Sequence, residues 1–200
     1  MDGILRLRRI GTGATTLVAT ALMLGVLWGC DRGGNRLDAY AAGSLEALQV
    51  PETLTAAPTQ GFLTADGAAT DLSAYRGRVV VLNVWAMWCR PCRTELPTIA
   101  ALDAAYGEDL AVVAINVDRT PEEIEAGRAF LSENAPLAFY SDPTFELPFR
   151  LPGRGAMPQT ILIDRQGRIR AWLAGEADWS SPEARALVEA LLAEEGRGRP

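Results

Sequence analysis

The stretch VVVLNVWAMWCRPCRTELP, residues 79–97, decides the fold class. Apart from one asparagine, its first part, residues 79–85, is apolar, which predicts a strand that is buried on both faces. Apolar residues then recur at helical spacing after Cys89, at Leu96, Ile99, Ala100 and Leu102. The sequence therefore predicts a buried strand, a short loop and a helix that begins near Cys89.

The same order of strand and helix recurs farther along the chain. LAVVAINV, residues 110–117, predicts a second buried strand. In TPEEIEAGRAFLSENA, residues 120–135, Thr120 is a helix cap and Pro121 occupies the first turn. Two strands joined by a helix predict a parallel pair with a right-handed crossover.

Other segments predict antiparallel pairs and a terminal helix. Asp66-Gly67 favours a tight hairpin turn between two short extended pieces. QTILID, residues 159–164, and GRIRAWLA, residues 167–174, predict a second hairpin. The last helix is amphipathic and begins at a cap, Ser181. Together these elements predict an α/β domain with a central sheet.

Composition limits the number of domains and the kinds of partner. A chain of 200 residues with 48% hydrophobic residues can bury one good core. All 19 basic residues are arginines and the net charge is −6, whereas nucleic-acid binding needs clustered positive charge. We expect a signal anchor or lipoprotein signal at 1–30, a linker at 31–57, one folded domain at 58–195 and a tail at 196–200.

The amino terminus predicts export to the bacterial cell envelope. Arg6, Arg8 and Arg9 precede an uncharged run, residues 10–29. A membrane-spanning helix needs roughly 20 apolar residues, and the positive side stays in the cytoplasm, so the domain is expected in the periplasm. LWGC, which ends at Cys30, is similar to a lipoprotein box. Three outcomes stay open: an uncleaved anchor in the inner membrane, a lipid-modified Cys30, or cleavage to a soluble protein.

The cysteine pair has three interpretations. A structural zinc site needs about four ligands, and the chain has no histidine and two cysteines in its domain. A structural disulfide between Cys89 and Cys92 closes a very small loop and adds little stability. A helix start favours the thiolate form of Cys89, while Cys92 lies nearly one turn on and inward. We therefore favour a redox pair, with a structural pair or a two-coordinate copper(I) site as the alternatives.

These residues resemble the thioredoxin-fold thiol-disulfide reductases, and more closely the TlpA/ResA-like branch. DLSAYRGRVVVLNVWAMWCRPCRTELP, residues 71–97, is similar to the hairpin, central strand and active-site helix of that branch. GAMPQTILIDRQGRI, residues 155–169, is similar to the segment that carries a cis-proline, here Pro158. LAVVAINVD and AGEADW also look like the alphaproteobacterial subgroup. The resemblance covers residues 61–193 and implies a thioredoxin-like fold, a central mixed sheet flanked by helices, with an N-terminal hairpin and a helix-bearing insert.

The resemblance also implies roles for individual residues. It makes Cys89, Cys92, Glu95 and Pro158 the candidate catalytic residues, and Trp88, Arg90, Pro91 and Met157 the candidate substrate contacts. Thioredoxins carry a buried aspartate where this chain has Asn83, and Glu95 matches a glutamate of the TlpA/ResA-like branch. Our hypothesis is that Glu95 modulates proton transfer at Cys92; the alternative is an exposed glutamate that only favours the helix dipole. For Trp85 and Trp88 we favour structural roles over substrate contact.

The function implied by the resemblance is reduction of protein disulfides in an oxidising compartment. Implied substrates are apocytochrome c or copper-site assembly proteins of cytochrome oxidase, and electrons would come from a membrane protein of the DsbD or CcdA kind. We expect a monomer without a cofactor. An oxidase or isomerase of secreted proteins is the alternative within the class. A copper chaperone of the Sco kind is disfavoured because the chain lacks C-x-x-x-C and a histidine.

Overall fold

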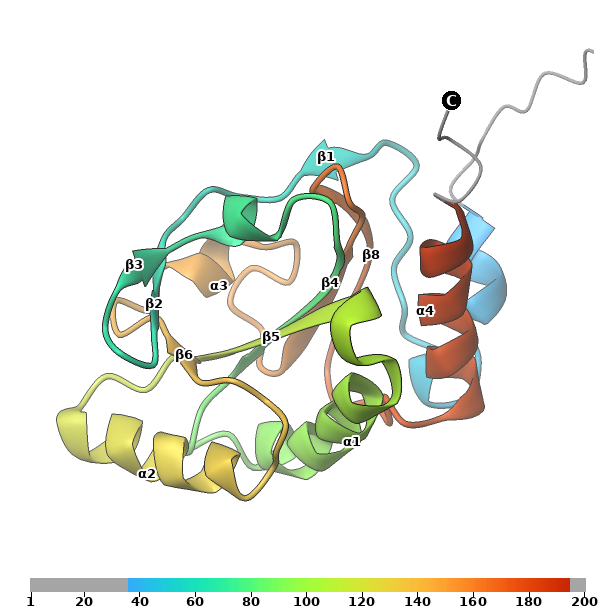
Figure 1. Cartoon of the computed structure of the whole chain (residues 1–200). Coiled ribbons are helices and arrows are strands. Elements are labelled where there is room, and N and C mark those ends of the chain that lie inside the picture. The colour runs from blue at the N-terminus through green and yellow to red at the C-terminus, as the bar shows by residue number, and fades with distance from the viewer. Residues whose placement is uncertain (1–35, 195–200) are drawn as a thin grey trace, which may run out of the picture. The chain divides into compact units, whose positions relative to one another are not determined.

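The structure is a computed structural model, of which residues 36–194 are described here (Figure 1). Eight strands form one mixed sheet in the order β1-β8-β7-β4-β5-β6-β2-β3. The strands are β1 (Thr55–Ala56), β2 (Phe62–Thr64), β3 (Ala69–Thr70), β4 (Val79–Trp85), β5 (Leu110–Asn116), β6 (Tyr140–Ser141), β7 (Gln159–Ile163) and β8 (Arg168–Ala174). The α-helices are α1 (Arg90–Tyr106), α2 (Pro121–Ser132), α3 (Leu147–Arg150) and α4 (Pro182–Glu194). Four 3-10 turns complete the fold: Arg36–Tyr40, Gly43–Leu45, Leu72–Tyr75 and Gly107–Asp109.

The centre of the sheet is the parallel pair β4 and β5. The pair runs in register from Val79 opposite Leu110 to Trp85 opposite Asn116, and every residue of both strands is buried. This confirms the predicted parallel pair, and the continuous apolar runs follow from burial on both faces. The predicted central mixed sheet with flanking helices is confirmed as well.

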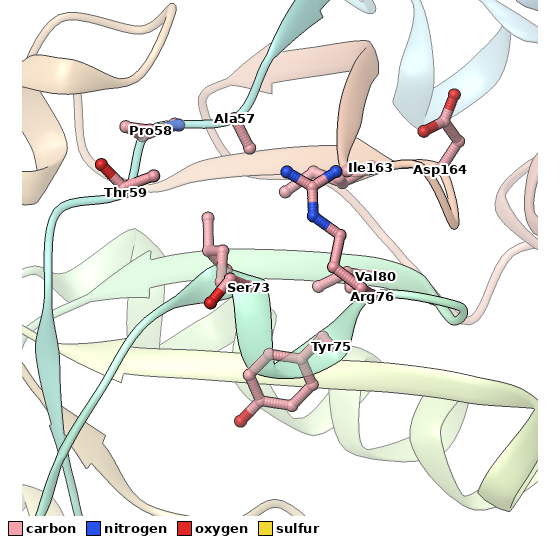
Figure 2. Close-up of a pocket in the computed structure, with 11 residues that line it drawn as sticks. Ala57, Pro58, Thr59, Ser73, Tyr75, Arg76, Val80, Ile163 and Asp164 are labelled. Carbon is pink, nitrogen blue, oxygen red and sulfur yellow. The ribbon is translucent and has the colours of Figure 1, made fainter.

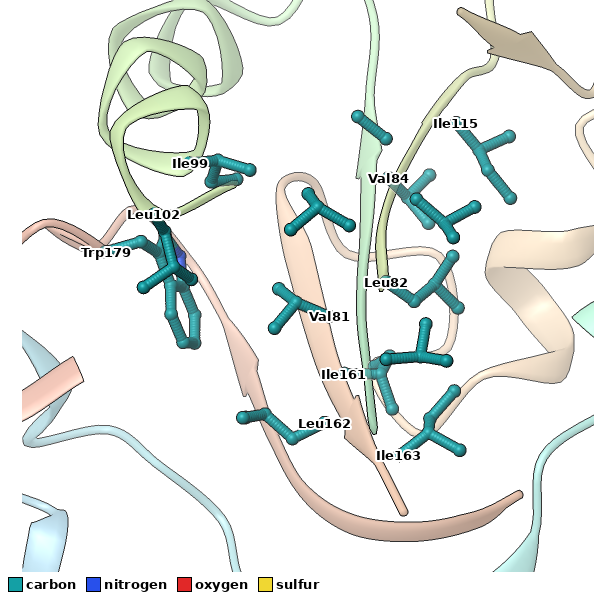
Figure 3. Packing of buried hydrophobic residues seen from close by; sticks show 14 of the residues in the cluster. Val81, Leu82, Val84, Ile99, Leu102, Ile115, Ile161, Leu162, Ile163 and Trp179 are labelled. Carbon is teal, nitrogen blue, oxygen red and sulfur yellow. The ribbon is translucent and has the colours of Figure 1, made fainter. Parts of the chain in front are cut away.

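The core lies on both faces of β4. Figure 3 shows Ile99 and Leu102 of α1 on the side that Val81 faces, whereas Leu82 and Val84 point the other way. This alternation is the period of two of a strand, and α1 covers one face because its apolar residues share one stripe. The helix is thereby fixed against the strand whose end precedes the cysteines.

The predicted caps and hairpins are confirmed. Thr120 and Glu123 form a capping box at the start of α2, and the Ser181 hydroxyl accepts the N–H of Ala184 at 3.3 Å at the start of α4. β2 pairs with β3 across the Asp66-Gly67 turn, and β7 pairs with β8. These features depend on local sequence, which explains why the sequence predicts them well.

The segment 36–57, predicted as a linker, is packed against the domain. Leu37, Leu45 and Leu48 are buried, and the first two 3-10 turns contact α4. β1 pairs antiparallel with β8, so the segment also extends the sheet. The segment packs against the domain because burial of the three leucines removes apolar surface from water.

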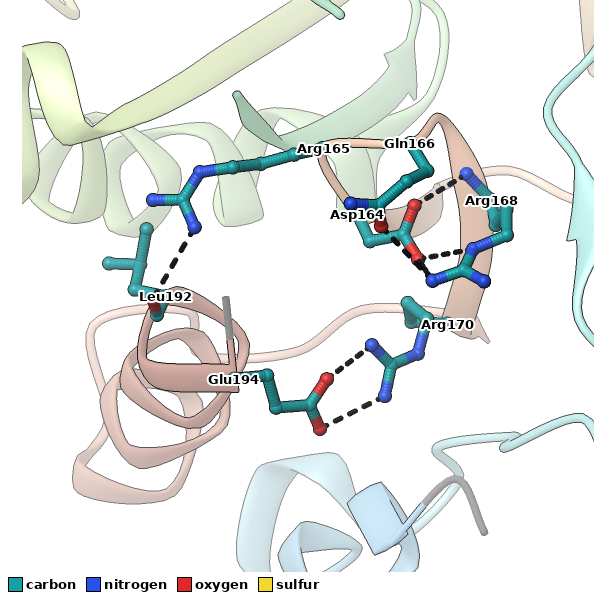
Figure 4. A network of polar contacts seen from close by, with 7 residues as sticks. All are labelled: Asp164, Arg165, Gln166, Arg168, Arg170, Leu192 and Glu194. Atoms are coloured by element: carbon teal, nitrogen blue, oxygen red, sulfur yellow. Dashed lines mark hydrogen bonds and ion pairs between the residues drawn. The ribbon is translucent and has the colours of Figure 1, made fainter. Parts of the chain in front are cut away.

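Polar contacts hold α4 to β8 and the turn before it. Figure 4 shows two contacts between the Arg170 guanidinium and the Glu194 carboxylate, and a bond from Arg165 to the backbone oxygen of Leu192 at 3.5 Å. Within residues 36–194, no helix is both long and apolar enough to cross a membrane. The predicted envelope segment at 1–30 and the tail at 196–200 lie outside the described residues.

Candidate active site

The cysteine pair stands where β4 passes into α1. Cys89 is the N-cap of α1, and Cys92 lies in its first turn behind Pro91. The two sulfurs form a disulfide of 2.05 Å, with the Cα atoms 5.3 Å apart. The Cys89 sulfur accepts the N–H of Cys92 at 3.3 Å, the bond that a thiolate at a helix start would receive. Cys89 keeps 5% of its surface exposed and Cys92 keeps 0%, so only the first residue of the pair has surface open to solvent.

Glu95 is buried beneath the pair rather than exposed. Its side chain is 1% exposed, so the alternative of an exposed first-turn glutamate is wrong. One carboxylate oxygen accepts the indole N–H of Trp179 at 2.6 Å, and the other accepts the amide N–H of Asn83 at 3.1 Å. Since Glu95 follows Cys92 by three residues, the two side chains share one face of α1.

Burial governs the protonation of Glu95. It raises the pKa of this carboxyl from 4.5 to about 8, although the hydrogen bonds from Trp179 and Asn83 act in the opposite direction. An ordinary thiol has a pKa of about 8.5, so the carboxyl and a cysteine thiol hold a proton with similar strength. The site therefore has a group suited to exchanging a proton with Cys92.

Asn83 extends this polar cluster to the neighbouring strand. Its amide donates to Glu95 and also to the hydroxyl of Thr160 on β7, the latter at 2.9 Å. Asn83, Glu95 and Thr160 are all buried, and among the described residues the Asn83 Oδ1 has no partner. The cluster joins β4, α1, β7 and the loop before α4. Sequence reasoning identified Asn83 and Glu95 but not Thr160 or Trp179.

Asp118 supports the loop before Cys89, and sequence reasoning missed it. This residue follows β5 and is 0% exposed; one of its carboxylate oxygens accepts the backbone N–H of Met87 at 2.8 Å and the side-chain N–H of Asn116 at 2.6 Å. Burial raises the pKa of Asp118. Its position in the sequence could have indicated this role. Asp118 comes directly after a buried strand parallel to β4, so it lies at the same edge of the sheet as the residues that follow β4.

The cis peptide bond predicted at Met157–Pro158 is present; Ala135–Pro136 is cis as well. Gln159, the next residue, is paired with Val84 near the end of β4. Pro158 therefore lies at the same end of the sheet as the cysteines. Its role, like that of Met157, stays a prediction.

The other predicted contacts differ in exposure. Arg90 is exposed, Pro91 is half-buried and Trp88 is 56% exposed. Trp85 is wholly buried at the end of β4, as its predicted structural role requires. Trp88 packs edge-on against Phe145, with ring centroids 6.3 Å apart. Substrate contact by Trp88, Arg90 and Pro91 remains a prediction.

A small cavity lies at the other end of β4. It has a volume of about 20 Å³ and is lined by Val80, Tyr75, Arg76 and Asp164 among others (Figure 2). A cavity of this size has room for about one water molecule. The length of β4 separates this cavity from the cysteines, because Val80 lies near the start of the strand and Cys89 follows its end.

Comparison with known proteins identifies the family of this chain. A model of the AhpC/TSA family matches residues 53–172. The chain is 35% identical over 153 residues to the thiol:disulfide interchange protein DsbE homolog of Paracoccus denitrificans. The aligned part covers 69% of this chain and 76% of that protein. It is 33% identical over 120 residues to the thioredoxin-like protein YneN of Bacillus subtilis, covering 57% of this chain and 66% of YneN.

Solved structures share the fold. A thiol:disulfide interchange protein DsbE from Chlorobium tepidum superimposes with a TM-score of 0.61 at 29% identity, over 72% of this chain and 99% of that chain. The chain spans less than two thirds of several curated relatives, among them 62% of the thiol-disulfide oxidoreductase ResA of Geobacillus thermodenitrificans, at 28% identity over 55% of this chain. The chain belongs to the AhpC/TSA family, among its thioredoxin-like relatives of the DsbE and ResA type.

Proposed function

We propose that this protein is a thiol-disulfide oxidoreductase that reduces disulfides of partner proteins through Cys89 and Cys92. The observation that carries the proposal is the disulfide at the start of α1, in which Cys89 keeps some exposed surface and Cys92 is fully enclosed. A structural disulfide across so short a loop adds little stability, so this position is better explained by turnover. The names of the relatives, thiol:disulfide interchange proteins and thiol-disulfide oxidoreductases, support the same class of reaction.

The exchange has two steps. The Cys89 thiolate attacks one sulfur of a partner disulfide, forms a mixed disulfide and releases the first partner thiolate. The Cys92 thiolate then attacks the Cys89 sulfur, which closes the Cys89–Cys92 disulfide and releases the second partner thiolate. Two electrons pass from the dithiol to the partner. The helix start and the N–H of Cys92 stabilise charge on Cys89.

Glu95 supplies the proton balance of the second step. Before Cys92 attacks, its thiol must lose a proton, and an ionised Glu95 on the same face of α1 can accept it. When an electron donor reduces the disulfide again, Cys92 leaves as a thiolate and a protonated Glu95 can return the proton. A pKa of about 8 suits both directions, because neither transfer is strongly uphill.

The partners we propose are apocytochrome c or copper-site assembly proteins, with a membrane protein of the DsbD or CcdA kind as the electron donor. Resemblance of the motifs around residues 71–97 and 155–169 to the TlpA/ResA-like branch supports this choice. An oxidase or isomerase of secreted proteins is the competing role for the same site.

Trapping of mixed disulfides tests the proposed function. In Cys92→Ser, Cys89 should still attack a partner disulfide, but no second thiol can resolve the mixed disulfide. Partners should therefore accumulate as covalent adducts that a reductant cleaves. Cys89→Ser is the matched control and should trap little, because Cys92 is enclosed. Adducts with the proposed partners would support the reductase, whereas a broad set of unrelated secreted proteins would favour the oxidase or isomerase. Trapping by neither variant would contradict a redox role.

The amino-terminal segment is proposed to hold the domain at the outer face of the inner membrane. The uncharged run at residues 10–29, behind three arginines, supports the tether. The full-length chain should stay with membranes after a high-salt wash, and the chain deleted through Gly34 should not. Recovery of the full-length chain in the soluble periplasmic fraction would contradict the tether, and mass spectrometry at Cys30 would distinguish an acyl chain from an anchor.

A further inference from the structure

Two exposed aromatic side chains stand out beside the cysteines. Among the described residues, Trp88 and Phe149 are the large hydrophobic residues with exposed side chains, at 56% and 59%. Both contact Phe145: its ring centroid is 6.3 Å from that of Trp88 and 5.5 Å from that of Phe149, and both pairs are edge-on. Trp88 directly precedes Cys89. We call Trp88, Phe145 and Phe149 the aromatic row; it leads from the nucleophile across the surface to α3.

The backbone around the row fixes the rings in place. Phe145 has a φ of 58°, a conformation that bulky side chains adopt only where the surroundings enforce it. A Cβ at Gly155 would lie 2.5 Å from the Phe149 ring, so the ring rests directly on this glycine. An exposed ring held in this way loses little freedom when a partner covers it.

Phe149 also lines a groove. The groove has a volume of about 610 Å³ and runs between β1 and the segment around α3; its wall includes Thr55, Ile169, Phe149, Arg150 and Arg154. Arg150 and Arg154 are exposed, and neither guanidinium group has a hydrogen bond or ion pair among residues 36–194. Arg154 has a φ of 50°, again in the left-handed region. Two unpaired guanidinium groups in a chain of net charge −6 form a local site for negative charge.

We propose that this groove binds an acidic, extended segment of the substrate polypeptide that runs on from the cysteine that Cys89 attacks. The inference rests on the proposed function. The aromatic row contacts the residues nearest the substrate cysteine, and the two arginines select carboxylates farther along the segment. The β1–β8 wall of the groove lies at the end of β4 remote from the cysteines, because Thr55 pairs with Ile169 and Ile169 with Ile163. The aromatic row links Cys89 to the near side of the groove, and the charge of Arg150 and Arg154 favours an acidic partner.

Three synthetic disulfide peptides test this groove. They share one cysteine-containing core and carry flanks of glutamate, serine or lysine. Second-order rate constants are measured with the reduced full-length chain at low ionic strength. The glutamate peptide should react about tenfold faster than the serine peptide, and the difference should shrink with added salt. Equal rates for these two peptides would overturn the inference. Reaction of the wild type with hydroxyethyl disulfide, which has no flanks, tests the proposed function separately.

Variants locate the effect. Arg150→Gln combined with Arg154→Asn, which tolerates the left-handed backbone, should bring the glutamate-to-serine ratio close to one. The matched control, Arg36→Gln with Arg185→Gln, removes the same charge from exposed positions outside the groove and should keep the wild-type ratio. The same ratio in both double variants would overturn the inference. A groove variant that keeps the peptide ratio but loses binding to anionic phospholipid vesicles would assign the arginines to a lipid surface, and the inference would be wrong.

Discussion

The two sides of the cysteine pair differ in almost every physical property. Beneath Cys92, the polar cluster of Asn83, Glu95, Thr160 and Trp179 is sealed from solvent, and both oxygens of its single carboxylate accept hydrogen bonds. Beside Cys89, Trp88 and Phe149 of the aromatic row are exposed and Phe145 is half-buried, and the guanidinium groups of the arginines at its far end have no partner among the described residues. The two regions meet at the start of α1, which carries both cysteines.

The difference corresponds to two steps of the reaction. Proton exchange at Cys92 needs a carboxyl whose surroundings stay constant, and burial supplies them. Recognition needs a surface that is complete only when a partner covers it, and exposed rings meet that need. The contrast teaches that changes in the buried cluster alter stability and pH dependence, whereas changes in the exposed row alter the choice of substrate.

The two tryptophans that flank the site give the largest predicted contrast. Trp179→Ala should lower the free energy of unfolding by about 3–5 kcal/mol, because it leaves a cavity and removes a donor to buried Glu95. Trp88→Ala, the matched control, should change it by less than about 0.5 kcal/mol, because that side chain is exposed. Urea unfolding of both variants measures the difference. Equal losses would show that the two regions are not energetically distinct.

A second prediction concerns the pH dependence of stability. An unfolded glutamate loses its proton near 4.5, whereas Glu95 in the folded protein keeps it to about 8. Between these values the folded state binds the extra proton, so the contribution of Glu95 to stability is lost as the pH rises, by about 1.4 kcal/mol per pH unit. Glu95→Gln removes this contribution. The stability of the wild type relative to the variant should therefore fall between pH 5 and pH 8.

Urea unfolding at pH 5, 6.5 and 8 checks the second prediction. The difference between wild type and Glu95→Gln isolates this carboxyl from other groups, such as Asp103 and Asp118, whose pKa burial also raises. A difference that is constant across the three pH values would contradict the account of the buried cluster.

The smallest predicted effect is that of Thr160→Val. The exchange keeps the shape but removes the hydroxyl that accepts the amide N–H of Asn83, and we expect a loss of about 1–2 kcal/mol. The pH dependence should persist, because Glu95 remains buried. Loss of the pH dependence in this variant would mean that Thr160, rather than burial, controls the carboxyl.

Features with a local or periodic signal could be predicted from the sequence. Strands β4 and β5, the start of α1 and the capping box of α2 all depend on neighbouring residues, and the structure has them where the sequence predicts them. The redox pair was predicted from its spacing and position, and the structure joins Cys89 and Cys92 in a disulfide. Glu95 became a candidate through the resemblance to the TlpA/ResA-like branch. Its burial in the structure rules out the alternative of an exposed glutamate that only favours the helix dipole.

Features that depend on distant contacts could not be predicted. Trp179 reaches Glu95 across 84 positions of the chain, and no periodicity marks that pair. The leucines of segment 36–57 are buried only because α4 and β8 receive them. The aromatic row was missed because Phe145 and Phe149 lie in irregular chain and in the short α3, where spacing carries no information.

Differential alkylation tests the central claim, that Cys89 attacks while Cys92 stays enclosed. The reduced full-length chain is treated with limiting iodoacetamide across a range of pH, and peptide mapping assigns the modified cysteines and separates them from Cys30. The account predicts that within the pair Cys89 is modified first at every pH, and that Cys92 reacts at a comparable rate only after unfolding. Modification of Cys92 before Cys89, or of both at equal rates in the folded protein, would contradict it.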